Sequence, residues 1–154
     1  MALLYYDPVF LEHDTGAHPE SASRIVPVVR HLNFIALDAL CTRPSWAPAT
    51  IERITRIHTP DYVEAVEAFA AQGGGYIEPD TAVCPRSYEV ARTAAGAVCD
   101  AVERVVRGED TRAFCLVRPP GHHALPEWAM GFCLLNNIAI AARLATAELD
   151  LDRV

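Results

Sequence analysis

The sequence predicts an α/β protein with a parallel sheet flanked by helices, and three observations support this fold class. Two short apolar runs, 3–6 and 113–117, have the composition of buried strands. Apolar residues recur at helical spacing through much of the chain between and after these runs. Strands separated by helices favour a parallel sheet with right-handed crossovers. The 154 residues suffice for one domain or for part of a larger one.

Composition and charge narrow the class of protein. Hydrophobic residues make up 51% of the chain and charged residues 21%, as in globular proteins. The net charge of −7 argues against nucleic-acid binding, which needs a basic face. No apolar run approaches the roughly 20 residues that span a bilayer, and the first residues lack a secretion signal, so we expect a cytoplasmic protein. The five cysteines include no C-x-x-C pair and are expected to be reduced thiols.

The N-terminal half is predicted to hold one strand and three helices. A loop rich in His, Gly and Pro follows the strand at 3–6. Apolar residues at helical spacing then predict a helix over 21–39, with a serine as its cap. A short helix at 50–57 and a longer one at 60–71 come next. The longer helix begins with Thr-Pro-Asp, which supplies a cap, a first-turn proline and a carboxylate near the positive helix end.

The C-terminal half continues the alternation of helix and strand. Three consecutive glycines stop the preceding helix, and 76–86 is predicted to be a long loop. Ser87 is expected to cap a long helix that ends at Gly108 and has an apolar stripe on one face. The strand at 113–117 follows. A last helix at 137–147 is rich in small residues that suit close packing on a sheet.

Two adjacent histidines, His122 and His123, lie between that strand and the last helix. They follow Arg-Pro-Pro-Gly at the end of a strand, where open α/β sheets build their sites. Three roles stay open for the pair: two metal ligands, a base with its electrostatic partner, or two polar loop residues. Because consecutive side chains on extended backbone diverge, general acid/base catalysis fits better than a shared metal. Three other histidines lack a metal-binding spacing and are expected to be hydrogen-bonding or capping residues: His13, His18 and His58.

Four further residues are candidates for the same site. Gly131 and Phe132 are either a tight turn with a core phenylalanine or the wall of a narrow slot for an aliphatic chain. Cys133 beside them is a weaker candidate for a thiol nucleophile, with one of the histidines as its base. Asp80 is either a solvated loop carboxylate or a rim residue that meets a cationic or amide-bearing substrate.

The residues around the histidines resemble a known family. RPPGHHA at 118–124, followed by GFCLLNN at 131–137, resembles the active-site signature of the zinc-dependent histone deacetylases. The likeness is strongest to class II-like members and to bacterial amidohydrolases or acetylpolyamine deacetylases. HPE at 18–20 and IHTPDYV at 57–63 resemble earlier landmarks of that family in the same order. The resemblance implies an arginase/deacetylase-type fold, with 1–154 as the N-terminal portion of a single domain.

The resemblance also implies a reaction, the hydrolysis of acetyl-lysine or an acetylpolyamine. His123 would be the general base and His122 its electrostatic partner, which helps to protonate the leaving amine. Phe132 would line the acyl channel, and Gly131 would offer its carbonyl to the substrate. Zinc is the implied cofactor, but the family's zinc ligands are expected beyond Val154. We therefore expect no metal ligands here, a domain truncated before its metal-binding strand, and no activity of the chain alone.

Two other functions stay open at this stage. The chain could be a non-catalytic binding module with a deacetylase fold, or, less well supported, a metal-free hydrolase that uses Cys133. As partners, we expect an acetylated amine substrate and no direct contact with nucleic acid or membrane. A homo-oligomer is left open.

Overall fold

The computed structural model describes residues 1–154 and has the α/β architecture that the sequence predicts. The strands are β1 Ala2–Tyr5, β2 Cys41–Thr42, β3 Gly75–Glu78, β4 Thr81–Val83 and β5 Ala113–Cys115. The α-helices are α1 Ala22–Phe34, α2 Ile51–Thr55, α3 Pro60–Ala71, α4 Ser87–Val106 and α5 Asn137–Glu148. Two 3-10 helices complete the chain, η1 Pro8–Leu11 and η2 Asp38–Leu40.

The main sheet is parallel and has the strand order β2-β1-β5. Leu3 pairs with Ala113 and Tyr5 with Cys115, so the two apolar runs of the sequence are neighbours in the sheet. The Leu116 amide still donates to the Tyr5 carbonyl, at 2.8 Å, before the chain leaves the sheet. β5 is one edge of this sheet, and the histidine loop, defined as residues 118–136, starts where its pairing ends.

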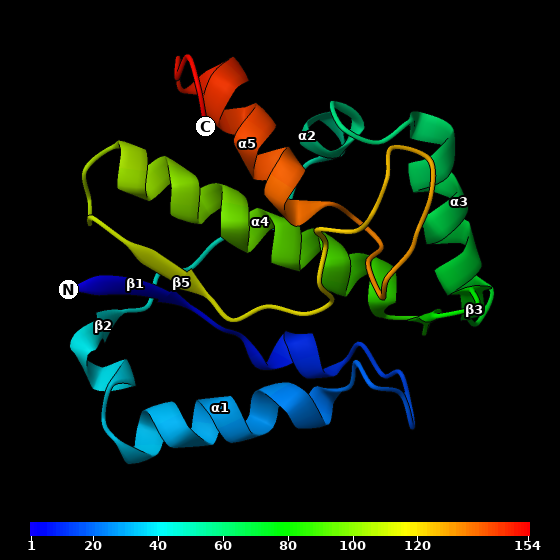
Figure 1. Cartoon of the computed structure of the whole chain (residues 1–154), viewed down its shortest axis with the longest axis horizontal. Helices are drawn as coiled ribbons and strands as arrows, with labels where there is room; N and C mark the ends of the chain where they lie inside the picture. Colours follow the sequence, from blue (N-terminus) through cyan, green and yellow to red (C-terminus); the bar gives the residue numbers. More distant parts are fainter.

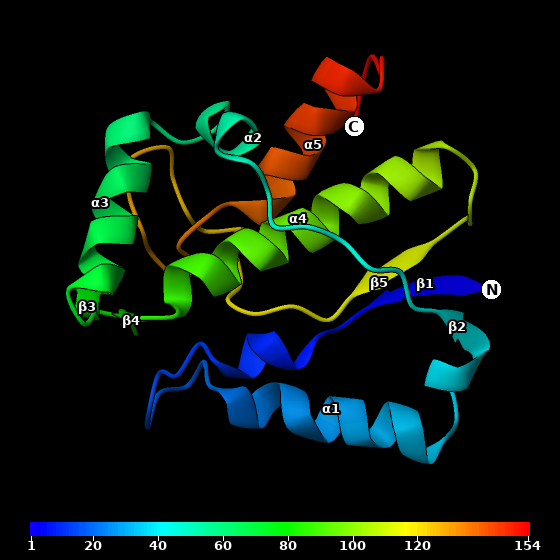
Figure 2. The same cartoon turned by 180° about the vertical axis from the view of Figure 1, so that it is seen from behind.

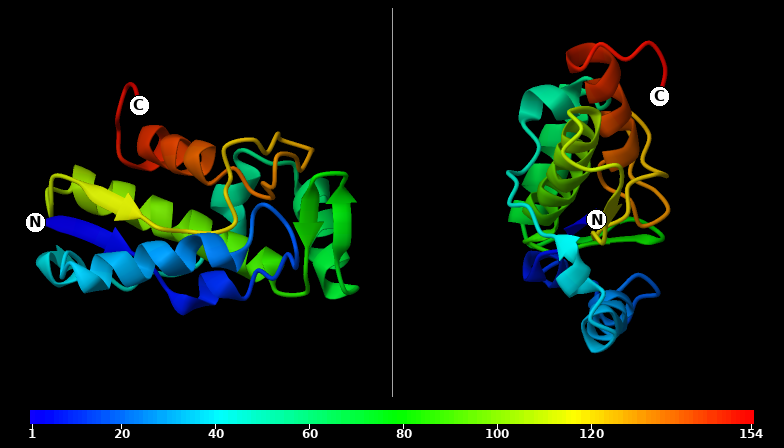
Figure 3. Two further views of the ribbon diagram at one scale, coloured as in Figure 1. Left: turned by 60° about the horizontal axis from the view of Figure 1, so that its bottom comes forward. Right: turned by 90° about the vertical axis from the view of Figure 1, so that its left-hand side faces the viewer.

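Helices lie on both sides of the sheet. α4 covers one face of β1 and β5, and α1 lies on the other side of the sheet (Figures 1 and 3). The small residues of α5 suggested that it packs on the sheet, but α5 packs on α4 instead. α4 therefore separates α5 from the strands (Figure 2). The small residues of α5 permit this close approach, but to a helix.

The largest buried cluster is centred on α4. It joins one face of α4 to α2, α3, α5 and the histidine loop, and small side chains such as Ala91, Ala95 and Cys99 let these elements approach closely. A smaller cluster lies between α4 and the sheet and includes Leu3 and Tyr5. One face of α4 therefore packs against the histidine loop, while another face covers the sheet.

Several expected boundaries are wrong. Most of the expected loop at 76–86 is instead the antiparallel hairpin β3–β4, which ends at Val83, because Pro79-Asp80 turns the chain between two short strands. The first helix stops at Phe34 rather than Ala39, and Ala36 just beyond it has a φ of 56°, outside the helical region. Ser87 is the first residue of α4 and not its cap, since its hydroxyl accepts from the Cys84 amide at 2.7 Å.

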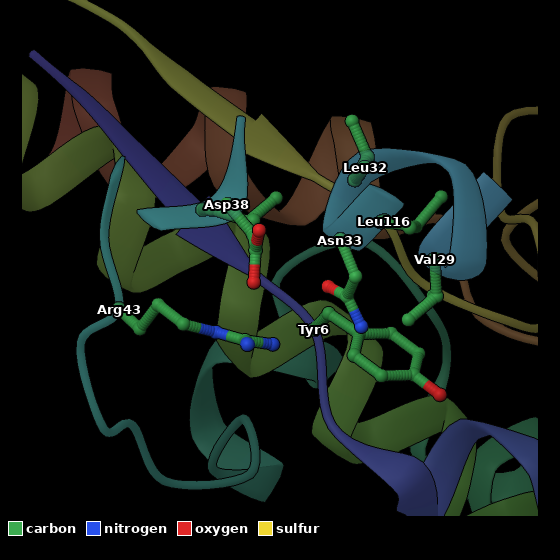
Figure 4. A pocket seen from close by; sticks show the side chains of 8 residues that line it. Tyr6, Val29, Leu32, Asn33, Asp38, Arg43 and Leu116 are labelled. Atoms are coloured by element: carbon green, nitrogen blue, oxygen red, sulfur yellow. The ribbon is translucent and has the colours of Figure 1, made fainter. Parts of the chain in front are cut away.

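Between α1 and the sheet lies a small pocket (Figure 4). Its free volume of about 10 Å³ is no more than one water molecule needs. Apolar side chains of α1 face Leu4 and Leu116 across it, with Asp38 and Arg43 at one side. This pocket therefore has no room for a ligand. None of the helices has both the length and the apolar character that a membrane crossing requires.

Candidate active site

A buried ion pair fixes the start of the histidine loop. Arg118, the first residue of the histidine loop, is 3% exposed and donates to both carboxylate oxygens of Glu20, at 2.5 and 2.8 Å. Its other contacts are the carbonyls of Phe10 at 2.9 Å and His13 at 3.1 Å. The Arg118 guanidinium thus joins the histidine loop to the segment before α1. Its two parallel hydrogen bonds to the Glu20 carboxylate leave the Arg118 side chain little freedom.

Glu20 is charged in this setting because its partners outweigh its burial. Burial alone would raise the pKa of Glu20, but the hydrogen bonds and charges of Arg118 and His13 lower it from 4.5 to about 2. His13 lies 3.5 Å from the carboxylate through Nε2 and 2.7 Å from the Ser87 hydroxyl through Nδ1. The expected hydrogen-bonding role of His13 is confirmed, and it links the ion pair to the start of α4.

His122 and His123 lie side by side at the surface. Their ring centroids are 4.3 Å apart, with the planes tilted by 52°, and both side chains are exposed. They line an open cleft of about 510 Å³, whose other walls include Gly131 and Phe132. Four of the five predicted site residues therefore line one cleft, although their chemical roles stay predictions.

Gly131 is needed where it is because it packs directly on His123. A Cβ at this position would lie 2.7 Å from Cδ2 and 2.8 Å from Cγ of the His123 ring. The backbone is also left-handed here, with φ of 56° at Gly131 and 69° at Phe132. The Phe132 ring meets the edge of the His18 ring, with centroids 4.8 Å apart. The turn at 131–132 is both tight and part of the cleft wall, but Phe132 is only half-buried and does not belong to the core.

Asp80 reaches the same turn from the β3–β4 hairpin. Its carboxylate accepts from the Gly131 amide at 3.2 Å and from the Thr81 hydroxyl at 2.7 Å. The Thr81 hydroxyl oxygen in turn accepts from the Phe132 amide at 3.2 Å. His18 meets the Asp80 carbonyl through Nε2 at 3.1 Å, so it is a hydrogen-bonding residue as expected. Asp80 holds the turn rather than lining the cleft, and direct contact with substrate stays a prediction.

Cys133 is poorly suited to act as a nucleophile. Its side chain is fully buried, and burial raises the pKa of its thiol. The sulfur lies 3.3 Å from the Gly131 carbonyl, as a weak donor to it. A reactive cysteine needs the opposite setting, exposed and with a lowered pKa. The Cys133 thiol therefore helps to stabilise the turn at 131–132.

Arg24 and Pro19 also line the cleft but were not among the predicted site residues. Arg24 is on the first turn of α1, with its guanidinium 3.8 Å from Glu20. The only sequence signal for them is the HPE motif with an arginine four residues after its glutamate. No three His, Cys, Asp or Glu side chains gather closely enough to hold a metal ion.

Comparisons with known proteins agree with this arrangement. The family model of the histone deacetylase domain matches residues 18–154. The chain is 39% identical to an uncharacterized Synechocystis protein, over 100% of this chain and 52% of that one. It is 40% identical to a histone deacetylase-like amidohydrolase of Pseudomonas aeruginosa, over 88% of this chain and 35% of that one.

A solved structure confirms the predicted fold class. The crystal structure of the HDA15 HD domain matches 96% of this chain with a TM-score of 0.89 and 33% identity, and the match covers 44% of that chain. The present chain thus spans about half the length, or less, of the proteins that it matches. The matched family model and these relatives show that the chain belongs to the histone deacetylase family.

Proposed function

We propose that this chain supplies the proton-transfer and acyl-channel part of a deacetylase site that acts on acetyl-lysine or acetylpolyamine substrates. The observation that carries the proposal is the pair of adjacent imidazoles in one cleft with the Gly131–Phe132 turn. Membership of a deacetylase family supports amide hydrolysis as the reaction class. The cleft is large enough for the acetylated end of an amine, and Phe132 offers its aliphatic stem an apolar wall.

In the proposed reaction, His123 acts as the general base. A water oxygen adds to the acetyl carbonyl carbon while the water's proton passes to the His123 imidazole. The C–N bond then breaks, and the amine leaves with a proton from an imidazole, so that acetate and free amine are the products. His122, 4.3 Å away between ring centroids, is the electrostatic partner of His123 and assists protonation of the amine.

Zinc, the cofactor that the family resemblance implies, does not fit the side chains of this chain. His122 and His123 are not joined by a third ligand, and no group of three candidate ligands occurs elsewhere. A catalytic zinc needs three protein ligands. We therefore propose that the chain alone has no turnover.

The test places this chain in a complete catalytic context. Residues of the Pseudomonas amidohydrolase that match this chain are replaced by it, and hydrolysis of an acetyl-lysine peptide and of acetylspermidine is measured. His123→Ala should lower kcat by about 10²–10⁴-fold. Unchanged turnover in a folded H123A chimera would refute His123 as the base. Binding of the acetylated peptide without turnover in every chimera would favour the non-catalytic binding module.

Two glycine variants provide a matched comparison for the geometry of the site. Gly131 and Gly16 have similar left-handed φ values, 56° and 61°, but a Cβ at Gly16 meets nothing within 4 Å. Both alanine variants carry the same backbone strain, whereas only Gly131→Ala displaces the His123 ring. We expect G131A to lose about 10²-fold in kcat, as misplacement of a catalytic group can do, and G16A to keep it. Equal kcat values for G131A and G16A would contradict the proposed role of His123 in the reaction.

A further inference from the structure

We propose that His58 is a positioning residue that holds the histidine loop in place as a neutral imidazole. His58 lies in the short connection between α2 and α3 and is 1% exposed. It does not line the cleft. Its relevance to catalysis rests on the proposed function, but its effect on the loop can be measured without any activity.

The residues at 58–59 bind the loop at two separate points. The Asn136 amide donates to Nε2 of His58 at 2.8 Å, close to the end of the loop. The Thr59 amide donates to the Pro126 carbonyl at 3.0 Å, in the middle of the loop. The His58 ring is itself fixed by stacking on Tyr62, with centroids 5.2 Å apart, and the Tyr62 hydroxyl donates to the Leu134 carbonyl at 2.7 Å. A rigid connection between two helices thus holds both arms of the loop.

Asn136 carries this constraint to the candidate catalytic residues. Its side-chain amide donates to the Ala124 carbonyl at 2.9 Å, one residue after His123. Its side-chain oxygen accepts from the Ala139 amide at 3.0 Å and so caps α5. If Asn136 lost its bond to His58, the cap of α5 and the backbone next to His123 would loosen together.

The bond to Asn136 requires one protonation state of His58. Because Nε2 accepts a hydrogen bond, the single proton of the neutral ring is on Nδ1. Nδ1 is buried beside the Leu125 and Pro126 carbonyls but meets neither of them in hydrogen-bond geometry. A second proton would occupy Nε2, so that two donors, this N–H and the Asn136 N–H, would face each other. Protonated His58 therefore cannot keep this hydrogen bond.

The surroundings favour the neutral ring. Burial lowers the pKa of His58, although the carbonyls of Pro126 and Leu125 act in the opposite direction. No ionised side chain contributes to this shift. The ionisable side chains on α2, α3, the connection between them and the histidine loop are Glu52, Arg53, Arg56, Asp61, Tyr62, Glu64, Glu67, Arg118, His122, His123, Glu127 and Cys133. A folded pKa below the ordinary 6.5 means that the constraint is complete above pH 6.5 and weakens as pH falls below it.

Amide hydrogen exchange of the full chain tests the proposal between pH 5 and 7. Protection factors of Asn136 and Ala139 in the wild type should fall by up to about tenfold per pH unit as His58 becomes protonated. His58→Gln keeps an acceptor that does not titrate, so its protection should be independent of pH. His58→Phe keeps the stacking but removes the acceptor, and its protection at pH 7 should be about tenfold lower, the loss of one hydrogen bond.

His31→Gln is the matched control, because His31 is an exposed histidine on α1, away from the loop. It should keep the wild-type pH profile. Two results would overturn the proposal: H58Q with the same acid loss as the wild type, or folded H58F with wild-type protection at pH 7. If H58F does not fold, the comparison of H58Q with the wild type decides. None of these results depends on whether the protein is a deacetylase, so failure of this proposal is distinguishable from failure of the proposed function.

Discussion

At the scale of single residues, the contact between Glu20 and Arg118 sets the position of the histidine loop. Both side chains are at most 3% exposed, and they come from segments 98 residues apart in the sequence. A buried ion pair of this kind contributes little net stability compared with apolar packing, but removal of one partner leaves an uncompensated charge. The pair therefore matters most for where the loop begins.

The lowered pKa of Glu20 predicts a specific acid sensitivity. The pKa of Glu20 is about 2 in the folded protein, against 4.5 for an ordinary glutamate, so Glu20 stabilises the fold above about pH 4.5, and this contribution is lost as pH falls toward 2. Glu20→Gln should lower the free energy of unfolding at pH 7 by about 3 kcal/mol and reduce its slope between pH 5 and 2. Urea unfolding at a series of pH values measures both quantities.

Glu12 provides the control for this experiment. It pairs with Arg86 at 2.8 Å, but both side chains are about half exposed, at 48% and 55%. Exposed pairs contribute about 0–1 kcal/mol, so Glu12→Gln should leave the pH profile nearly unchanged. If E12Q and E20Q have the same effect, burial of the Glu20 pair does not determine the acid sensitivity.

At the scale of elements, the position of α4 depends on Gly96. A Cβ there would lie 2.1 Å from the Ala47 carbonyl oxygen and 2.8 Å from the Ala49 amide nitrogen. The helix and the segment 47–49 therefore touch through their backbones. Trp46 closes the same contact, since its indole N–H donates to the Thr93 carbonyl at 3.0 Å.

Gly96→Ala should destabilise the protein although alanine is the better helix former by about 1 kcal/mol. Because the contact is with backbone atoms, α4 must shift away from 47–49, and we expect a net loss of about 1–3 kcal/mol, as for other overpacked sites. Thermal or urea unfolding measures it. Gly108→Ala, where a Cβ meets nothing within 4 Å, should lose only the cost of its left-handed φ. A G96A variant at least as stable as the wild type would contradict the close contact.

How well the sequence predicts each of these elements depends on whether its signals are local along the chain. α2, α3 and α4 start within a residue of their expected positions, because caps, prolines and apolar spacing are local. The hairpin β3–β4 was missed because its strands are only four and three residues long, too short for a clear alternation. The partner of α5 was missed because small residues suit a helix as well as a sheet.

The site likewise contains residues that the local sequence predicts and contacts that it does not. His122, His123, Gly131 and Phe132 could be found because they lie in one contiguous motif. The contacts that hold this motif could not, since His58 is 78 residues from Asn136 and Asp80 is 51 residues from Gly131. Spacing along the chain contains no information about such pairs until the fold brings them together.

At the scale of the whole molecule, the buried apolar side chains around α4 form the largest core cluster. The cluster around α4 contains 17 buried residues, and no metal-binding group of side chains occurs. Structural zinc sites contribute directly to folding, so chelation unfolds proteins that depend on them. We expect EDTA to leave the melting temperature of this chain unchanged, and mass spectrometry of metals to find far less than one zinc per chain. One tightly bound zinc, lost together with the fold, would contradict this.

The exposed edge of the main sheet predicts self-association. β5 pairs with β1 on one side only, and Phe114 in its centre is 50% exposed. An unpaired strand with an exposed apolar side chain is a template for pairing with a second copy. Sedimentation velocity should therefore find a larger average mass at higher concentration for the wild type, and Phe114→Lys should suppress it. Phe34→Lys, which removes an aromatic ring that is 86% exposed but lies on α1, should not. If both variants suppress association equally, surface hydrophobicity rather than the strand edge drives it.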